Sequence, residues 1–309
     1  MSAAAGCDVV MLIGFGGPQG PTQIRPYLDR VLKGRPVPAE RYEEVVRHYQ
    51  ALGGRSPYNE LTLRQAAGVR EALVRRGCPM PVAVGFRHAP PYIEGIIREL
   101  AASGHRRVLG FILAAFRCEA SWERYQNDAA AACAALGASA PAMVYPAPWH
   151  TRPGFISAVA DNTQRALAQF DEADRRYAEL IFTAHSIPLA MAAGAPYVHQ
   201  LEEAASLVAR TVGRKRWQLA FQSRSGNPRE PWLEPDVHTA LCASPAPKLL
   251  IPLGFLCDHI EVLYDLDVEA AAEARAAGLK LTRAAAVNDH SDFVGLMADM
   301  ALEYRQGEG

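Results

Sequence analysis

The segment DVVMLIGFGGPQGP, residues 8–21, begins with a continuous apolar run and ends in a glycine-rich turn. The run at 8–15 does not alternate polar with apolar residues, which is typical of a strand buried on both faces of a parallel sheet. The turn resembles a dinucleotide-binding loop, but the G-x-G-x-x-G spacing fails at Gln19 and Pro18 interrupts a helix start. We therefore interpret the glycines as a tight turn that permits close approach.

Seven further runs of this kind follow, at 82–86, 107–113, 142–145, 180–183, 217–222, 248–255 and 280–286. Ala-rich amphipathic stretches separate them, at 60–76, 91–103, 120–136, 154–170, 198–212 and 259–276. This alternation predicts an α/β protein built from βαβ units with parallel strands. Eight strands fit one closed barrel or two open sheets of four. The break in composition at 147–153 (APWHTRP) favours two sheets, and so a boundary near residue 150.

Composition excludes several classes of protein. The 309 residues include 33 acidic and 32 basic side chains, so the net charge of −1 argues against a nucleic-acid groove. No run of apolar residues is long enough to span a membrane, and the first 15 residues lack the features of a signal peptide. The six cysteines are at least 15 residues apart, which predicts free thiols in a reducing compartment and a cytoplasmic location.

Two segments contain chemically useful side chains. His185 directly follows the strand at 180–183; taken alone, such a histidine is more often structural than catalytic. Glu261, Asp265 and Glu269 recur every four residues in the stretch at 259–276, so on a helix they form one acidic stripe. The stripe fits either a solvated surface or a row of oxygen ligands that passes a hard divalent cation inward.

Several motifs together resemble the ferrochelatase family. They are GFGGPQGP (14–21), ALGGRSPYNELT (51–62), GFRHAPPYI (85–93), FTAHSIP (182–188), FQSRSGNPREPWLEPDV (221–237), PLGFLCDHIEVLYDLDVEA (252–270) and VNDHSDF (287–293). They occur in order and span residues 8–305, nearly the whole chain. The combination of HSIP with CDHIEVLYDLD is specific to this family.

The resemblance implies two Rossmann-like lobes, each a four-stranded parallel sheet flanked by helices, with the active site in the cleft between them. The lobes would cover residues 1–150 and 151–309, with a last helix at about 291–304 that packs back on the first lobe. His185 matches the family's invariant histidine and Glu261 its catalytic glutamate. Asp265 and Glu269 match the acidic trail behind that glutamate. The resemblance therefore implies that His185 and Glu261 are catalytic, and that these four residues contact the metal.

Candidate porphyrin-binding residues follow from the family's positions or from local position. The predicted porphyrin-facing wall consists of Ile13, Phe15, Ser56, Trp232 and Tyr264. Basic residues expected to pair with propionates are Arg30, Lys33, Arg35 and Arg55, although a solvated surface charge is the alternative for each. His88 falls where some members carry a histidine that contacts the metal.

The chain departs from the family's pattern at three places. Phe15 stands where some bacterial members have a tyrosine, so its ring lacks the oxygen. AAFRCEASW (114–122) replaces a run rich in serine and tyrosine, which introduces Arg117 and Glu119. No cysteine follows Cys257, so we expect no [2Fe–2S] cluster of the kind that some members hold in a C-terminal tail.

The implied activity is that of a porphyrin metal-chelating lyase, which inserts Fe²⁺, a substrate, during haem biosynthesis. The compact stretch at 15–41 looks most like the actinobacterial-type enzymes, which favours coproporphyrin III (giving coprohaem III) over protoporphyrin IX (giving protohaem). The alternatives are a cobalt or nickel chelatase, a tetrapyrrole carrier without activity, and a two-lobed small-molecule binding protein. We expect a monomer that makes at most transient contact with a downstream enzyme of haem synthesis.

Overall fold

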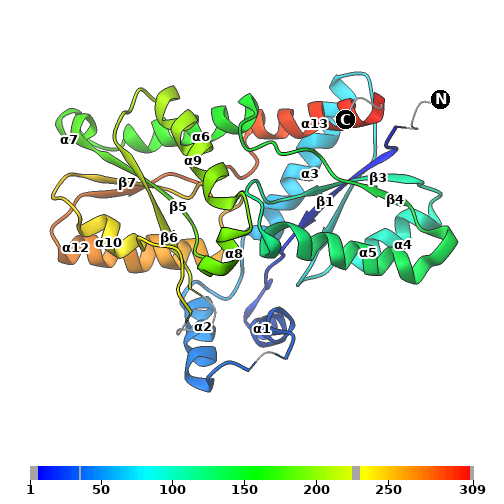
Figure 1. The fold of residues 1–309 in the computed structure, drawn as a ribbon, viewed down its shortest axis with the longest axis horizontal. Coiled ribbons are helices and arrows are strands. Elements are labelled where there is room, and N and C mark those ends of the chain that lie inside the picture. Colours follow the sequence, from blue (N-terminus) through cyan, green and yellow to red (C-terminus); the bar gives the residue numbers. More distant parts are fainter. Residues whose placement is uncertain (1–5, 35, 225–229, 307–309) are drawn as a thin grey trace. The chain divides into compact units, whose positions relative to one another are not determined.

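The computed structural model describes residues 6–34, 36–224 and 230–306. These residues form two compact units (Figure 1). Unit 1 comprises the described residues within 1–113, 120–149 and 289–309, and unit 2 comprises those within 114–119 and 150–288. The chain thus passes between the units several times.

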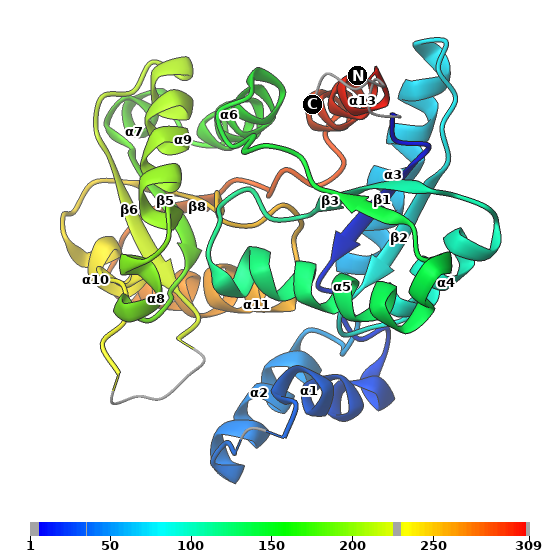
Figure 2. The same ribbon diagram turned by 45° about the vertical axis from the view of Figure 1, so that its right-hand side comes forward.

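Unit 1 contains a parallel sheet with the strand order β2-β1-β3-β4. Its strands are β1 (Val9–Gly14), β2 (Val82–Phe86), β3 (Arg107–Ile112) and β4 (Ala142–Val144). Its helices are α1 (Ile24–Leu32), α2 (Ala39–Ala51), α3 (Tyr58–Arg75), α4 (Ile93–Ala102), α5 (Arg124–Leu136) and α13 (Ser291–Gln306), with short turns η1 (Pro21–Gln23), η2 (Glu119–Glu123) and η3 (Gly137–Ser139). Helices α3 and α13 pack together, as do α4 and α5, and the two pairs cover opposite faces of the sheet (Figure 2).

Unit 2 contains a second parallel sheet, with the order β6-β5-β7-β8. Its strands are β5 (Glu179–His185), β6 (Trp217–Gln222), β7 (Lys248–Ile251) and β8 (Leu281–Arg283). Its helices are α6 (Pro153–Leu167), α7 (Glu172–Tyr177), α8 (Leu189–Ala193), α9 (Tyr197–Thr211), α10 (Val237–Cys242), α11 (Ile260–Val262), the π-helix η4 (Leu263–Ala270) and α12 (Ala271–Ala276). The two sheets confirm the predicted α/β fold with two four-stranded parallel sheets.

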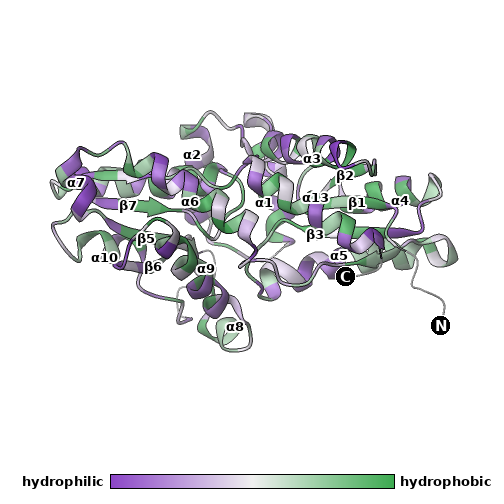
Figure 3. Ribbon diagram, turned by 90° about the horizontal axis from the view of Figure 1, so that it is seen from above, coloured by the Kyte–Doolittle hydropathy of each residue, from purple (hydrophilic) through white to green (hydrophobic). Residues whose placement is uncertain are grey.

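The central strands are apolar because both faces of each sheet are covered. Figure 3 shows β5 and β7 largely in the colour of hydrophobic residues. In unit 2, Ile181 and Leu250 on the sheet pack against Leu241 of α10 and against Val262 and Leu266 of the helix at 260–276. Burial of each such side chain contributes about 1.5–3 kcal/mol. This core fixes the helix that carries the acidic stripe against the sheet that carries His185.

Some boundaries differ from those predicted. Strand β7 ends at Ile251 rather than at residue 255, because Pro252 cannot donate a ladder hydrogen bond. Strand β8 spans Leu281–Arg283 instead of 280–286. Helices α1 and α2 were not among the predicted elements; α1 contains Pro26 near its start, where the missing N–H costs little.

Candidate active site

His185 is the last residue of β5, at the carboxyl edge of the second sheet. The Ser186 N–H donates to the Gln222 carbonyl at 2.7 Å, which holds the backbone here against β6. His185 Nδ1 donates to the Ser186 carbonyl oxygen at 2.5 Å, and Tyr197 Oη donates to the His185 carbonyl at 2.9 Å. Since a carbonyl oxygen only accepts, Nδ1 carries a proton and Nε2 of the neutral ring is free to accept one.

Glu261 lies opposite this nitrogen. It occupies the first turn of α11, where its neighbours Ile260 and Val262 are buried in the core, so its own side chain is left partly exposed. Glu261 Oε1 is 3.9 Å from His185 Nε2 and 3.8 Å from His259 Nε2. These separations exceed a hydrogen bond, as is common for catalytic groups before substrate binds. One oxygen of the Glu261 carboxylate thus faces the imidazoles of His185 and His259, which are far apart from each other in the sequence.

His259 supplies a neutral imidazole. Burial lowers the pKa of His259 to about 4, so that the ring is uncharged at neutral pH. Its ring lies 5.2 Å from that of Phe255. The charge of Glu261 is therefore not neutralised by His259 under physiological conditions.

Asp265 is the second member of the acidic stripe. Its Oδ2 accepts from Gln222 Nε2 at 3.1 Å and from the Ser223 hydroxyl, both at the carboxyl end of β6. Ser223 has a positive φ of 62°, an uncommon backbone conformation for a residue other than glycine. Burial and the nearby charge of Glu261 raise the pKa of Asp265, although the two hydrogen bonds oppose the rise.

The acidic stripe lies on a helix that is partly a π-helix, η4. A π-helix is wider than an α-helix and is frequent at functional sites. Glu269 continues the stripe at its exposed end. Tyr264, also in η4, is half-buried. Trp232 is also half-buried and forms an isolated bridge with Pro188, just beyond His185. The structure therefore brings His185, Glu261 and Asp265 together, with Glu269 one step further along the same row.

A polar clamp holds the turn that precedes Glu261. Asn288 Oδ1 accepts from the Asp258 N–H at 2.8 Å, and Asn288 Nδ2 donates to Asp258 Oδ2 at 2.7 Å. Arg283 donates to Asp258 Oδ1 at 2.8 Å and forms a fork with Asp267 at 2.6 and 2.9 Å. Bidentate arginine–carboxylate pairs are both strong and directional. The clamp therefore ties the turn before α11 to the π-helix after it.

The unit 1 candidates for the porphyrin-facing wall differ in exposure. Phe15 is half-buried, and its ring lies 4.4 Å from that of His88. Ile13 is fully buried in β1, and Ser56 is buried with its hydroxyl accepting from the Tyr58 N–H at 3.3 Å. Of these positions, only Phe15 offers its side chain to solvent to any extent.

The basic candidates of unit 1 already have partners. Arg30 contacts Glu94 at 3.4 Å and lies 3.8 Å over the Tyr92 ring, and Lys33 Nζ is 3.5 Å from Asp128. Arg55 contacts Glu60 at 3.3 Å. Arg35 lies outside the described residues. Arg30 also donates to the Arg87 carbonyl, so Arg30 and Lys33 belong to one cluster and Arg55 does not.

His88 belongs to that same cluster. Burial and then the positive charges of Arg87 and Lys33 lower the pKa of His88 to about 3. Its side chain is therefore a neutral imidazole beside the Phe15 ring, in a positive environment.

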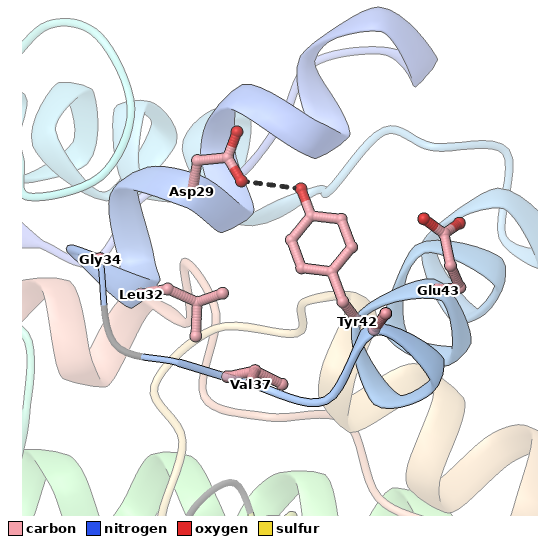
Figure 4. Close-up of a pocket in the computed structure, with 7 residues that line it drawn as sticks. Asp29, Leu32, Gly34, Val37, Tyr42 and Glu43 are labelled. Atoms are coloured by element: carbon pink, nitrogen blue, oxygen red, sulfur yellow. Dashed lines mark hydrogen bonds between the residues drawn. The ribbon is translucent and has the colours of Figure 1, made fainter.

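A hollow of about 450 Å³ lies between α1 and α2 in unit 1 (Figure 4). Its lining includes Leu32, Val37 and Tyr42, whose hydroxyl donates to Asp29 Oδ1 at 2.9 Å. None of the predicted site residues that the structure describes lines it. The hollow therefore does not mark the chemistry around His185, which belongs to unit 2.

A sequence model of the family described as Ferrochelatase matches residues 8–305. The chain belongs to the ferrochelatase family. It is 39% identical to a ferrochelatase of Rhodopirellula baltica, over 98% of this chain and 88% of the relative. It is 40% identical to a coproporphyrin III ferrochelatase of Mycolicibacterium smegmatis, over 97% of this chain and 90% of the relative.

Solved structures give the same fold. The chain is similar to the SirB protein from Bacillus subtilis solved with Fe³⁺, with a TM-score of 0.60 at 10% identity, over 96% of this chain and 95% of that one. The SirB sirohydrochlorin chelatase from Bacillus subtilis subspecies spizizenii, solved with cobalt, gives 0.57 at 12% identity, with the same coverage. At such low identity the likeness shows the chelatase fold alone. In the part of the chain that the structure describes, no helix is long and apolar enough to cross a membrane.

Several residues that contact the candidate residues of this ferrochelatase-family chain were not predicted from the sequence. Gln222 and Ser223 contact Asp265 and lie at the start of the motif at 221–237, so the motif was a signal for them that was not used. Arg87 and Asp128, which form an ion pair in unit 1, are 41 residues apart. His259 lies within the CDHIE motif and two residues before Glu261, so the motif was a usable signal for it.

Replacement of Asp265 by asparagine is expected to stabilise the protein at neutral pH. The raised pKa means that the folded state binds the Asp265 proton more tightly than the unfolded state, so this carboxyl destabilises the fold once the pH exceeds the raised pKa. Each pKa unit is worth about 1.4 kcal/mol, so we expect a gain of about 1–3 kcal/mol at pH 7. The gain should disappear as the pH falls towards about 4, the ordinary aspartate pKa.

Urea unfolding at pH 4 and pH 7 measures this difference. Glu269→Gln, at the exposed end of the same stripe, is the control and should show no comparable change with pH. An Asp265→Asn protein that is less stable than the native protein at pH 7 would show that the carboxylate is stabilised by its surroundings.

Proposed function

We propose that this chain inserts Fe²⁺ into coproporphyrin III and so forms coprohaem III in haem biosynthesis. The observation that carries the proposal is the family match over residues 8–305, together with His185 Nε2 and Glu261 Oε1 lying 3.9 Å apart. Three relatives at 38–40% identity, from Mycolicibacterium and Mycobacterium species, are named as coproporphyrin III ferrochelatases, which supports this porphyrin.

The reaction requires that two pyrrole N–H protons leave as one Fe²⁺ enters. In our proposal the acidic stripe delivers the ion to Glu261, because Glu261 is the member of the stripe that faces His185. His185 Nε2 accepts one pyrrole proton, since Nδ1 already donates to the Ser186 carbonyl. The Glu261 carboxylate accepts the other proton after iron has left it. Charge is balanced, because a dication replaces two protons.

The remaining substrate roles are also proposals. Coproporphyrin III carries four propionates, and Arg30 and Lys33 supply positive charge near Arg87 in unit 1. Phe15, Trp232 and Tyr264 offer partly exposed rings for the macrocycle. Ile13, Ser56 and Arg55 are weaker candidates, because the first two are buried and Arg55 is paired with Glu60 apart from the cluster. A monomeric state, a cytoplasmic location and the lack of a [2Fe–2S] cluster stay predictions.

Substrate choice is tested by comparing kcat/KM for Fe²⁺ insertion into coproporphyrin III and protoporphyrin IX under anaerobic conditions. We expect kcat/KM to be higher for coproporphyrin III. The variants Arg30→Gln and Lys33→Gln should raise KM for coproporphyrin III and so reduce the difference in kcat/KM between the two porphyrins. Arg64→Gln provides a control, because Arg64 pairs with Asp289 and has no proposed role. A higher value for protoporphyrin IX would leave the activity intact and refute the choice of porphyrin.

A further inference from the structure

The carbonyl of His185 is held by a phenol that lies outside the family motifs. Tyr197 Oη donates to the His185 carbonyl at 2.9 Å. Tyr197 is the first residue of α9, between the motifs at 182–188 and 221–237. The residue is only 5% exposed, and burial raises the pKa of the Tyr197 phenol above its usual value. The phenol therefore stays protonated and acts as a permanent donor.

Helix α9 holds this phenol in place. Tyr197 and Leu201 share the buried face of the helix, which packs on β6 and on α6 (Figure 2). In the same first turn, the buried Gln200 accepts from the Arg117 N–H through Oε1 at 2.8 Å. Arg117 belongs to the segment at 114–122 that departs from the family's pattern. The start of α9 is thus fixed both by its packing and by a hydrogen bond from this segment.

The peptide unit that follows His185 is held at both of its polar groups. Its oxygen accepts from Tyr197 Oη, and its N–H, that of Ser186, donates to the Gln222 carbonyl at 2.7 Å. Because a peptide unit is planar, these two hydrogen bonds, one from α9 and one to β6, fix its orientation. The next carbonyl along the chain, that of Ser186, accepts from His185 Nδ1. A fixed peptide unit therefore keeps this acceptor within reach of the imidazole ring.

We propose that Tyr197 is a positioning residue that keeps the His185 ring in its Nδ1–H form, with Nε2 directed at Glu261. The inference rests on the proposed function, in which Nε2 accepts a pyrrole proton. Which nitrogen of a neutral imidazole carries the proton is set by the hydrogen bonds that the ring makes. Without the phenol the peptide unit is held at one end only, so the Ser186 carbonyl shifts and the Nδ1–H form loses its advantage.

Nuclear magnetic resonance reads the form of the His185 ring directly. In protein labelled with ¹⁵N at histidine, correlations between the carbon-bound ring protons and the ring nitrogens distinguish Nδ1–H from Nε2–H. At a pH where the ring is neutral we expect the Nδ1–H pattern in the native protein and a gain of the Nε2–H form in Tyr197→Phe. The His185→Ala protein identifies the signal by its loss. An Nε2–H pattern in the native protein, or an unchanged pattern in Tyr197→Phe, would overturn the proposal.

Kinetics provide a second test. We expect Tyr197→Phe to lower kcat for Fe²⁺ insertion by about tenfold, the lower end of the loss seen when a metal site loses a supporting group. KM for both substrates should stay native, because in this proposal the phenol contacts neither of them. Tyr304→Phe is the matched control, since Tyr304 Oη accepts from the Ala147 N–H at 2.9 Å and has no proposed role. A raised KM with native kcat in Tyr197→Phe would refute a positioning role, as would equal losses of kcat in the two variants.

The two tests separate this inference from the proposed function. The spectra require no turnover, so they report the hold on His185 even in a protein that inserts no iron. Native iron insertion with an Nε2–H ring at His185 would refute this inference alone. An Nδ1–H ring that changes in Tyr197→Phe, in a protein that inserts no iron, would support the hold on His185 and refute the proposed function.

Discussion

Replacement of His185 by alanine is expected to lower kcat for Fe²⁺ insertion by about 10²–10⁴-fold, the usual contribution of a positioned general base. The side chain is held by its Nδ1 bond to the Ser186 carbonyl, so Nε2 faces Glu261 at 3.9 Å and can accept a pyrrole proton. Stopped-flow absorbance in the porphyrin Soret region measures the rate. Quenching of porphyrin fluorescence shows separately that the variant still binds its substrate.

His199→Ala is the matched control for this prediction. His199 is in the same unit, its side chain is 73% exposed, and its ion-pair partner is Glu203, which has no proposed role. The control should insert iron at the native rate. A His185→Ala protein with near-native kcat would remove both the proton-accepting and the iron-contacting roles from this residue.

Replacement of Glu179 by leucine is expected to destabilise the protein by about 3–5 kcal/mol, because it leaves a buried charge without its counter-ion. Lys248 at the start of β7 has no exposed surface, and its Nζ contacts Glu179 Oε2 at 2.5 Å and Ser244 Oγ at 2.6 Å. Burial opposes ionisation of Glu179, but the hydrogen bonds from Lys248 and Ser244, together with the charges of Lys248 and Arg216, outweigh burial and hold the pKa of Glu179 below its usual value. Once Glu179 is removed, the Ser244 hydroxyl is left to face the ammonium group.

The double variant Glu179→Leu/Lys248→Met is the control. It removes both charges and fills the space with apolar atoms, which is often neutral or stabilising for a buried pair. Urea unfolding followed by far-ultraviolet circular dichroism should show a large loss for the single variant and recovery in the double one. If Glu179→Leu unfolds at the same urea concentration as the native protein, the Lys248 ammonium is not desolvated in the folded protein.

The fold was largely predictable because its signals are local. Continuous apolar runs such as 180–183 and 217–222 mark strands that are covered on both faces, and the structure places strands at each of the eight predicted positions. Errors arose where a strand ends, as at Pro252, and at helices α1 and α2, which were not predicted. Helix α2 buries only Val46 fully, but Tyr42, Val45 and Tyr49 pack in the same cluster at helical spacing, which is a periodic signal that the prediction missed.

The site was predictable only in part. His185 and Glu261 came from motifs, and they are 76 residues apart in the sequence but 3.9 Å apart in the structure. The contacts that tune Asp265 depend on the end of β6 and on a positive φ at Ser223, neither of which composition reveals. The partners of Arg30 and Lys33 likewise come from distant segments, so their pairing with Glu94 and Asp128 was not foreseen.

The most direct test of the proposed function is the anaerobic absorbance spectrum of the native protein mixed with coproporphyrin III and Fe²⁺. We expect the free-porphyrin bands to be replaced by those of the iron porphyrin, at a rate that is proportional to protein concentration and far above that without protein. Tight porphyrin binding with no change beyond the rate without protein would contradict the account. The chain would then be a tetrapyrrole carrier, and the roles proposed for His185 and Glu261 would be wrong.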